Sequence, residues 1–80
     1  MKSPEINYVS NNSIMVINNY GSMRQLFVPF KAKVILPTSS LVKDAYVVVE
    51  EVQQHDKYLL LYRIANKWWP YYVFKLSVEF

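Results

Sequence analysis

The sequence predicts an all-β fold, in which five or six short antiparallel strands form one small domain. Short runs of β-branched and aromatic residues are separated by clusters of Asn, Ser and Pro, which favour turns. Hydrophobic residues make up 52% of the chain and charged residues only 19%, so the chain is too apolar to be intrinsically disordered. With 80 residues and no cysteine, there is room for a single domain and for no disulfide scaffold.

The N-terminal part of the chain is expected to be less regular than the rest. Pro4 and the polar cluster at residues 11–13 limit any strand that forms before residue 14. We therefore predict that residues 1–13 are a flexible segment or an edge strand. Residues 14–80 are predicted to form the single β-barrel domain.

The first hairpin of this domain is predicted around the only glycine of the chain. Residues 14–17 are rich in β-branched side chains and predict a strand. At residues 18–22 the asparagines and Gly21 can adopt the positive φ angles that a reversal requires. The chain is then expected to return along residues 23–30, with an interruption at Pro29, which has no N–H to donate to a sheet.

The segment from residue 40 to residue 54 fits two structures. Its polar residues recur at helical spacing and Ser40 is placed to cap a helix, which would give an α+β fold with that helix across an antiparallel sheet. Residues 46–49 oppose a helix, because a tyrosine followed by three valines has restricted χ1 freedom and favours a strand. We favour the strand and keep the helix as the alternative.

The C-terminal part is predicted to be a hairpin. Residues 57–64 are apolar on both sides of the alternation, as in a strand that is covered on both faces or wrapped into a barrel. Asn66 suits the tight turn because it tolerates the left-handed conformation. Residues 68–76 are predicted to continue as one strand, the second arm of this hairpin.

The order of these elements resembles the SH3-like class of small barrels. A strand at residues 33–36 is followed by a long loop at 37–45, and then by a three-strand meander that runs through Tyr46, Lys57 and Trp68. A partly open, strongly twisted barrel is the architecture that buries such short strands in one small domain. The resemblance therefore implies a small SH3-like, partly open barrel.

Catalysis is not expected. The single histidine, His55, lies beside Asp56 in a polar turn, where we expect it to be solvated, and the chain has no cysteine to act as a nucleophile or metal ligand. Glu50 and Glu51 are adjacent and would point to opposite faces of a strand. A chain whose only glycine is Gly21 has no glycine-rich phosphate loop. The sequence therefore predicts no catalytic residue, no metal site and no cofactor.

Aromatic and basic residues near the C-terminal hairpin carry the strongest functional signal. Alternation along a strand would place part of this aromatic set in the core and part on the surface. One interpretation is that both tryptophans are core residues, and the other is an aromatic face that binds a ligand. The tryptophan pair is similar to that of signalling SH3 domains, although the acidic loop of those domains has no counterpart here. The candidate ligand-binding residues are Trp68, Trp69, Tyr71, Tyr72, Arg63 and Lys67.

Three functions fit this pattern. The first is a non-enzymatic module that binds a protein partner through the aromatic face or an open strand edge. The second is a small barrel that binds single-stranded nucleic acid, with Lys75 added to the basic set. The third is a structural homodimer. The net charge is only +3, from nine Lys or Arg against six Asp or Glu, which favours the protein partner over nucleic acid.

The expected location is the cytoplasm. Absence of cysteine suits a reducing compartment, and the first residues contain no apolar run of the kind found in secretory signals. The longest apolar stretch, residues 68–74, is far shorter than the roughly 18 residues needed to cross a bilayer. We therefore expect no membrane association.

Overall fold

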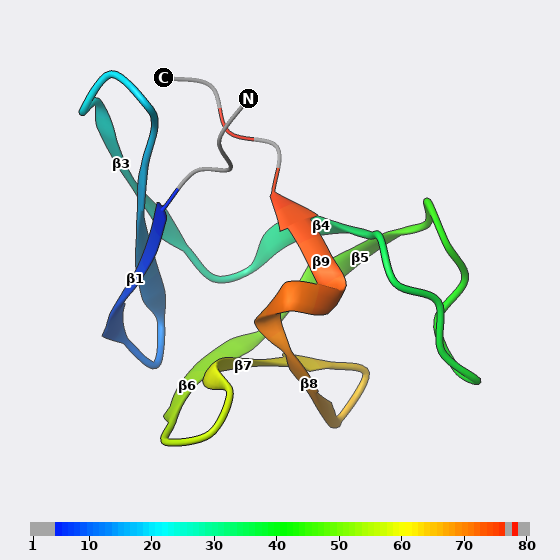
Figure 1. The fold of residues 1–80 in the computed structure, drawn as a ribbon. Coiled ribbons are helices and arrows are strands. Elements are labelled where there is room, and N and C mark those ends of the chain that lie inside the picture. Colours follow the sequence, from blue (N-terminus) through cyan, green and yellow to red (C-terminus); the bar gives the residue numbers. More distant parts are fainter. Residues whose placement is uncertain (1–4, 77, 79–80) are drawn as a thin grey trace.

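The structure, a computed structural model, describes residues 5–76 and residue 78. Within these residues the chain forms nine strands in three antiparallel sheets (Figure 1). The sheets have the strand orders β1-β2-β3, β5-β4-β9 and β6-β7-β8. The strands are β1 (Glu5–Ser10), β2 (Ser13–Ile17), β3 (Met23–Phe27), β4 (Phe30–Val34), β5 (Tyr46–Val49), β6 (Glu51–His55), β7 (Leu59–Ile64), β8 (Lys67–Pro70) and β9 (Phe74–Leu76), and a short 3-10 helix, η1 (Tyr71–Val73), joins the last two.

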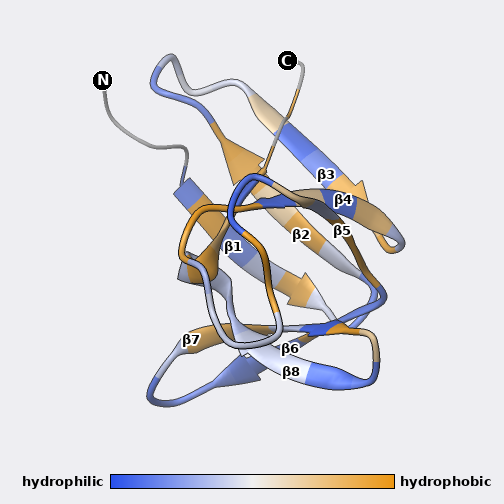
Figure 2. Cartoon of the chain, turned by 90° about the vertical axis from the view of Figure 1, so that its right-hand side faces the viewer, coloured by the Kyte–Doolittle hydropathy of each residue, from blue (hydrophilic) through white to orange (hydrophobic). Residues whose placement is uncertain are grey.

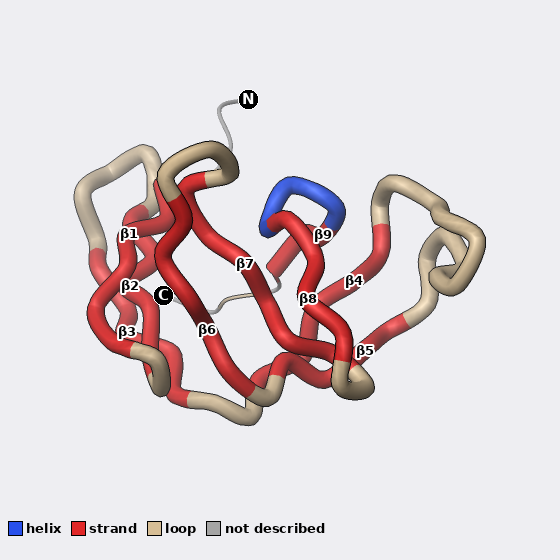
Figure 3. The backbone as a smooth tube through the Cα atoms, turned by 90° about the horizontal axis from the view of Figure 1, so that it is seen from below, coloured by secondary structure: helices blue, strands red, loops and turns tan. Residues whose placement is uncertain are grey.

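The predicted all-β, partly open small barrel is confirmed, but the described residues form nine short strands and not the five or six that the sequence predicts. The two sheets of the barrel are formed by β4 to β9, and the meander of β1, β2 and β3 packs beside them (Figure 3). The segment between β4 and β5 is the predicted long loop, and it folds back on β4 through a hydrogen bond from the Asp44 N–H to the Val34 carbonyl. Among the described residues there is no helix with the length and hydrophobicity required to traverse a lipid bilayer.

The two barrel sheets share one bent strand. β5 pairs with β4, whereas β6 pairs with β7, and only Glu50 separates β5 from β6. The Glu50 N–H still donates to the Arg63 carbonyl at 2.9 Å, and the Glu50 carboxylate accepts the Ala65 N–H at 3.0 Å. Glu50 therefore fixes both the bend and the turn between β7 and β8.

Segment 46–55 is extended, so the helical alternative for residues 40–54 is wrong. Val49 and Val52 are fully buried on the inner side of the bent strand, while Tyr46 and Val48 are exposed on its outer side. A helix would have lost both sheet ladders, in which residues 46–49 pair with β4 and residues 51–55 pair with β7. The β-branched run, and not the helical spacing of its polar neighbours, determines the structure.

One core joins the three sheets. Tyr62 in β7 is fully buried and lies between Phe30 of β4 and Phe74 of β9, with ring centroids 5.7 Å and 5.9 Å away. The meander adds Ile14 and Val16, both fully buried, from β2. In Figure 2 the hydropathy colours show hydrophobic segments on β2 and β7.

The uninterrupted strand predicted over residues 68–76 is wrong. β8 ends at Pro70, which has no N–H to extend the ladder, and the chain turns through η1, where the Phe74 N–H bonds to the Tyr71 carbonyl. Residues 74–76 then pair with β4 in the other sheet. The turn also resets the alternation, so that Val73 and Phe74, neighbours in sequence, are both buried.

Two predicted turns are confirmed in their detail. Ala65 and Asn66 both have positive φ, which is the geometry of a two-residue hairpin turn. Gly21 also has positive φ, and the Asn18 side chain accepts the N–H groups of Tyr20 and Ser22. The predicted strand at 23–30 is interrupted before β4 begins at Phe30, as the missing N–H of Pro29 requires.

The N-terminal segment contains an edge strand. β1 pairs with β2, and the ladder is irregular between Tyr8 and Ser10. The predicted boundary between residues 13 and 14 stays a prediction. The parts of the two predicted segments at residues 1–4, 77 and 79–80 lie outside the described residues.

The Tyr62 hydroxyl provides a test of the core. It is buried, and no group in the described part of the chain forms a hydrogen bond with it. A buried polar group without a partner costs about 1 to 3 kcal/mol. Tyr62→Phe is therefore expected to raise the free energy of unfolding at neutral pH by about 1 kcal/mol, as measured by urea denaturation.

The same substitution should change the response to alkali. Desolvation by burial, with a smaller contribution from Tyr71, raises the pKa of Tyr62 well above its ordinary value. The folded state therefore holds the Tyr62 proton more tightly than the unfolded state does. Above about pH 10 the unfolded state loses this proton first, so the free energy of unfolding falls as pH rises. The stabilising effect of Tyr62→Phe should grow above that pH. A Tyr62→Phe variant that is less stable than the parent both at neutral pH and in the alkaline range would contradict an unpaired Tyr62 hydroxyl.

Candidate functional site

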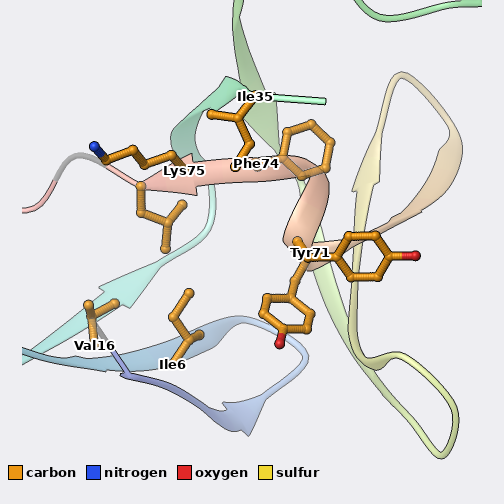
Figure 4. Close-up of a pocket in the computed structure, with 8 residues that line it drawn as sticks. Ile6, Val16, Ile35, Tyr71, Phe74 and Lys75 are labelled. Atoms are coloured by element: carbon orange, nitrogen blue, oxygen red, sulfur yellow. The ribbon is translucent and has the colours of Figure 1, made fainter. Parts of the chain in front are cut away.

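A mainly apolar groove lies between the meander and the barrel. Its volume is about 460 Å³, and Figure 4 shows the side chains that line it. One wall is the inner face of the meander, and the other is formed by η1, β9 and the start of the long loop. The lining residues are Ile6, Val16, Ile35, Tyr71, Tyr72, Phe74, Lys75 and Leu76.

The 3-10 helix positions the aromatic part of this groove. Val73 is buried, and its carbonyl accepts the N–H groups of Ile35 and Leu36 at 2.9 Å and 3.3 Å, which holds η1 against the long loop. The rings of Tyr71 and Tyr72 meet edge to face, with centroids 5.9 Å apart. Tyr71 packs against the core, whereas Tyr72 is 48% exposed. Tyr72 is therefore the accessible aromatic residue of the groove.

The groove also contains the open edge of β9. β9 pairs with β4 on one side, and no strand within residues 5–76 pairs with its other side. The Ile35 N–H bonds to the Val73 carbonyl, so these two residues form a hydrogen-bonded pair of the β4-β9 ladder. Such pairs alternate along an antiparallel ladder, and by this alternation the backbone groups of Leu76 point away from β4. An apolar, aromatic surface next to free strand groups suits an extended peptide, whose main chain can pair while its side chains fill the groove.

The structure separates the residues that the sequence grouped as ligand-binding. Tyr71 and Tyr72 line the groove. Trp68 is 40% exposed and lies opposite Arg63 on the outer face of the β6-β7-β8 sheet. Lys67 is exposed at the turn before it.

Trp69 differs from Trp68. It lies opposite the buried Tyr62 and packs against the core as a half-buried side chain. The two tryptophans therefore divide between the inner and outer faces of β8. The sequence left this division open because it depends on which side of the sheet the core covers.

A basic face forms where the sequence did not place one. β9 lies beside β4, and Lys75 is directly opposite Lys33, two residues from Lys31 on the same face. Tyr46, 64% exposed, is opposite Lys33 on the other side. Lys33 also forms a 3.6 Å ion pair with Asp44. Lys75 thus belongs with the lysines of β4 and not with the hairpin of Arg63.

His55 has a structural role in a second, more polar groove. This groove lies between β1 and the β6-β7 turn and includes Tyr8 and Leu59. The His55 Nδ1 atom accepts the N–H groups of Lys57 and Tyr58 at 3.1 Å and 3.3 Å, so the imidazole caps the turn and is only half-exposed. Within the described residues, no three acidic or histidine side chains converge as metal ligands would.

Sequence reasoning missed the wall of the groove that the meander supplies. Ile6 and Val16 precede η1 by more than fifty positions, and nothing in their local pattern indicates where β1 and β2 pack. Ile35 was read as part of a strand. Its exposure in the loop, at 39%, results from the early end of β4 at Val34.

Comparison of the chain with protein-family models, with curated proteins and with solved structures gives no significant match in any of the three.

The different positions of the two tryptophans lead to a direct test. Trp69→Ala removes core packing and is expected to lower the free energy of unfolding by about 3 kcal/mol. Trp68→Ala removes an outer-face side chain and is expected to cost about 1 kcal/mol or less. Urea unfolding of both variants measures the difference. Equal losses, or a larger loss for Trp68→Ala, would contradict this assignment.

Proposed function

We propose that this protein is a small non-enzymatic module that binds an extended, apolar segment of a partner protein. The groove formed by β1, β2, η1 and β9 is the proposed binding site. One observation carries the proposal: the half-exposed Tyr72 lies in an apolar groove next to an unpaired edge of β9. The proposal includes a cytoplasmic location, to which a chain without cysteine is suited.

The lining of the groove supports a peptide over a small polar ligand. Its side chains are aliphatic or aromatic, except for Lys75 at one end. Tyr72 supplies a large contact area at low entropic cost. Exposed aromatic residues in partly desolvated pockets often contribute most of the binding free energy.

Single-stranded nucleic acid is the second candidate function. The observation that favours it is the face of β4, β5 and β9, where the exposed Tyr46, Lys33 and Lys75 lie in a row across the three strands and Lys31 is two residues from Lys33. Lysines would contact phosphates, and a tyrosine ring would stack on a base. We rank this candidate second because Asp44 pairs with one of the three lysines.

Binding to a library of random dodecapeptides tests the groove. The wild-type protein is expected to enrich peptides with apolar or aromatic residues at alternate positions, because alternate side chains of an added strand face the groove. Tyr72→Ala should weaken binding of the selected peptides by about tenfold or more. Tyr20→Ala is the matched control, because Tyr20 is 93% exposed in the β2-β3 turn and far from η1 in sequence; it should leave the affinity unchanged.

Two results would contradict the proposal. One is the absence of any sequence enrichment, and the other is an equal loss of affinity in both tyrosine variants. Tight binding of a fluorescent oligothymidylate, with a steep logarithmic dependence on salt that Lys31→Ala and Lys75→Ala reduce, would instead favour the nucleic-acid function.

A further inference from the structure

The strand β3 has a free edge whose backbone groups can be assigned. β3 is the outer strand of its sheet and pairs with β2. The Val28 N–H bonds to the Asn12 carbonyl at 2.8 Å, and the Asn18 N–H bonds to the Ser22 carbonyl at 3.0 Å. Hydrogen-bonded pairs alternate along an antiparallel ladder, so Arg24 and Leu26 also bond to β2.

Three residues of β3 therefore direct their backbone groups outward. Met23, Gln25 and Phe27 alternate with the bonded residues, and their N–H and C=O groups point away from β2. Within the described part of the chain no strand pairs with these groups. Such an edge is a template for another strand.

We propose that two copies of this chain pair through β3, antiparallel about a two-fold axis at Gln25. In this register Gln25 lies opposite its own copy, and Met23 lies opposite Phe27 of the second copy. Every outward N–H and C=O group of these three residues then has a partner. The edge is thus complementary to itself, as a two-fold interface requires.

The side chains agree with the same register. Met23 and Phe27 are 65% and 63% exposed on the outer face of the sheet. Figure 2 shows β3 with a hydrophilic middle and a hydrophobic C-terminal end. Pairing covers both residues and brings the sulfur of one against the ring of the other, which is a favourable contact. Arg24 lies opposite Leu26, so no like charges face each other directly.

The edge carries a single protective charge, Arg24, which lies on the same face of the sheet as the buried Val16. Natural edge strands are blocked by lysine, proline, bulges or inward-pointing charges. Within β3 the one charged residue is Arg24, and Pro29 lies beyond its end. A five-residue edge is expected to bury less than the roughly 1,200 Å² at which stable interfaces begin, so the dimer is expected to be weak and concentration-dependent. This inference concerns a face other than the proposed peptide groove.

Sedimentation equilibrium of the full chain over micromolar to millimolar concentration tests the pairing. Gln25→Pro removes the central outward N–H and leaves the bonds to β2 in place, so it should weaken dimerisation by about tenfold or more. Gln25→Ala is the matched control. It loses the same 3.1 Å bond from the Gln25 amide to the Ser13 hydroxyl but keeps the backbone N–H, so it should dimerise as the parent does.

A pair of charge variants tests the register and does not depend on proline. Met23→Lys combined with Phe27→Lys places like charges opposite each other in the dimer and should abolish it. Met23→Lys combined with Phe27→Glu removes the same apolar side chains but places opposite charges together, and should dimerise at low salt. Circular dichroism of both variants checks that each one is folded.

Three outcomes would overturn the inference. The first is a parent chain that stays monomeric at millimolar concentration, and the second is a dimer that Gln25→Pro and Gln25→Ala affect equally. The third is equal dimerisation of the two charge variants, because the register would then be wrong. Tyr72→Ala should dimerise normally, so failure of the peptide-groove proposal leaves this test intact.

Discussion

The packing of Tyr62 between Phe30 and Phe74 is the interaction on which the fold depends. Each sheet has three strands of three to six residues, and such small sheets have little stability alone. The aromatic contacts connect the two barrel sheets, because Tyr62 comes from one sheet and both phenylalanines from the other. The meander covers the same core with Ile14 and Val16. Packing contacts between the sheets therefore stabilise the fold more than the pairing of strands within any one sheet does.

This constraint also creates the proposed site. Phe74 reaches the core only because the chain leaves β8 at Pro70 and turns through η1. The same turn leaves Tyr72 at the surface and places β9 as an outer strand of its sheet. Groove, aromatic residue and open edge are thus consequences of a single short turn. As a result, β9 has an edge that no other described strand covers.

The parts of the fold that could be predicted from the sequence are those with a local cause. β-branched runs indicate the strands, Gly21 and Asn66 indicate the reversals, and Pro29 indicates the break between β3 and β4. Pro70 is a local signal for the end of β8, but the aromatic run around it has strong strand propensity, and the conformation of residues 71–73 is set by the pairing of β9 with β4. Tertiary pairing overrode local preference at that point.

The candidate site was less accessible to sequence reasoning. Tyr71 and Tyr72 were selected for their aromatic character, but the opposite wall comes from residues whose only local property is hydrophobicity. The basic set was assembled by proximity in sequence, whereas cross-strand pairing places Lys75 beside Lys33. Sites built across sheets depend on register, and register follows from the whole topology.

Native-state hydrogen exchange tests the central claim most directly. If one aromatic core holds the sheets together, the slowest amides of β4 and β7 should exchange through the same global opening, with equal free energies and equal denaturant dependence. Exchange of β4 by an opening of much lower free energy than that of β7 would show that the sheets fold independently, and would contradict the account.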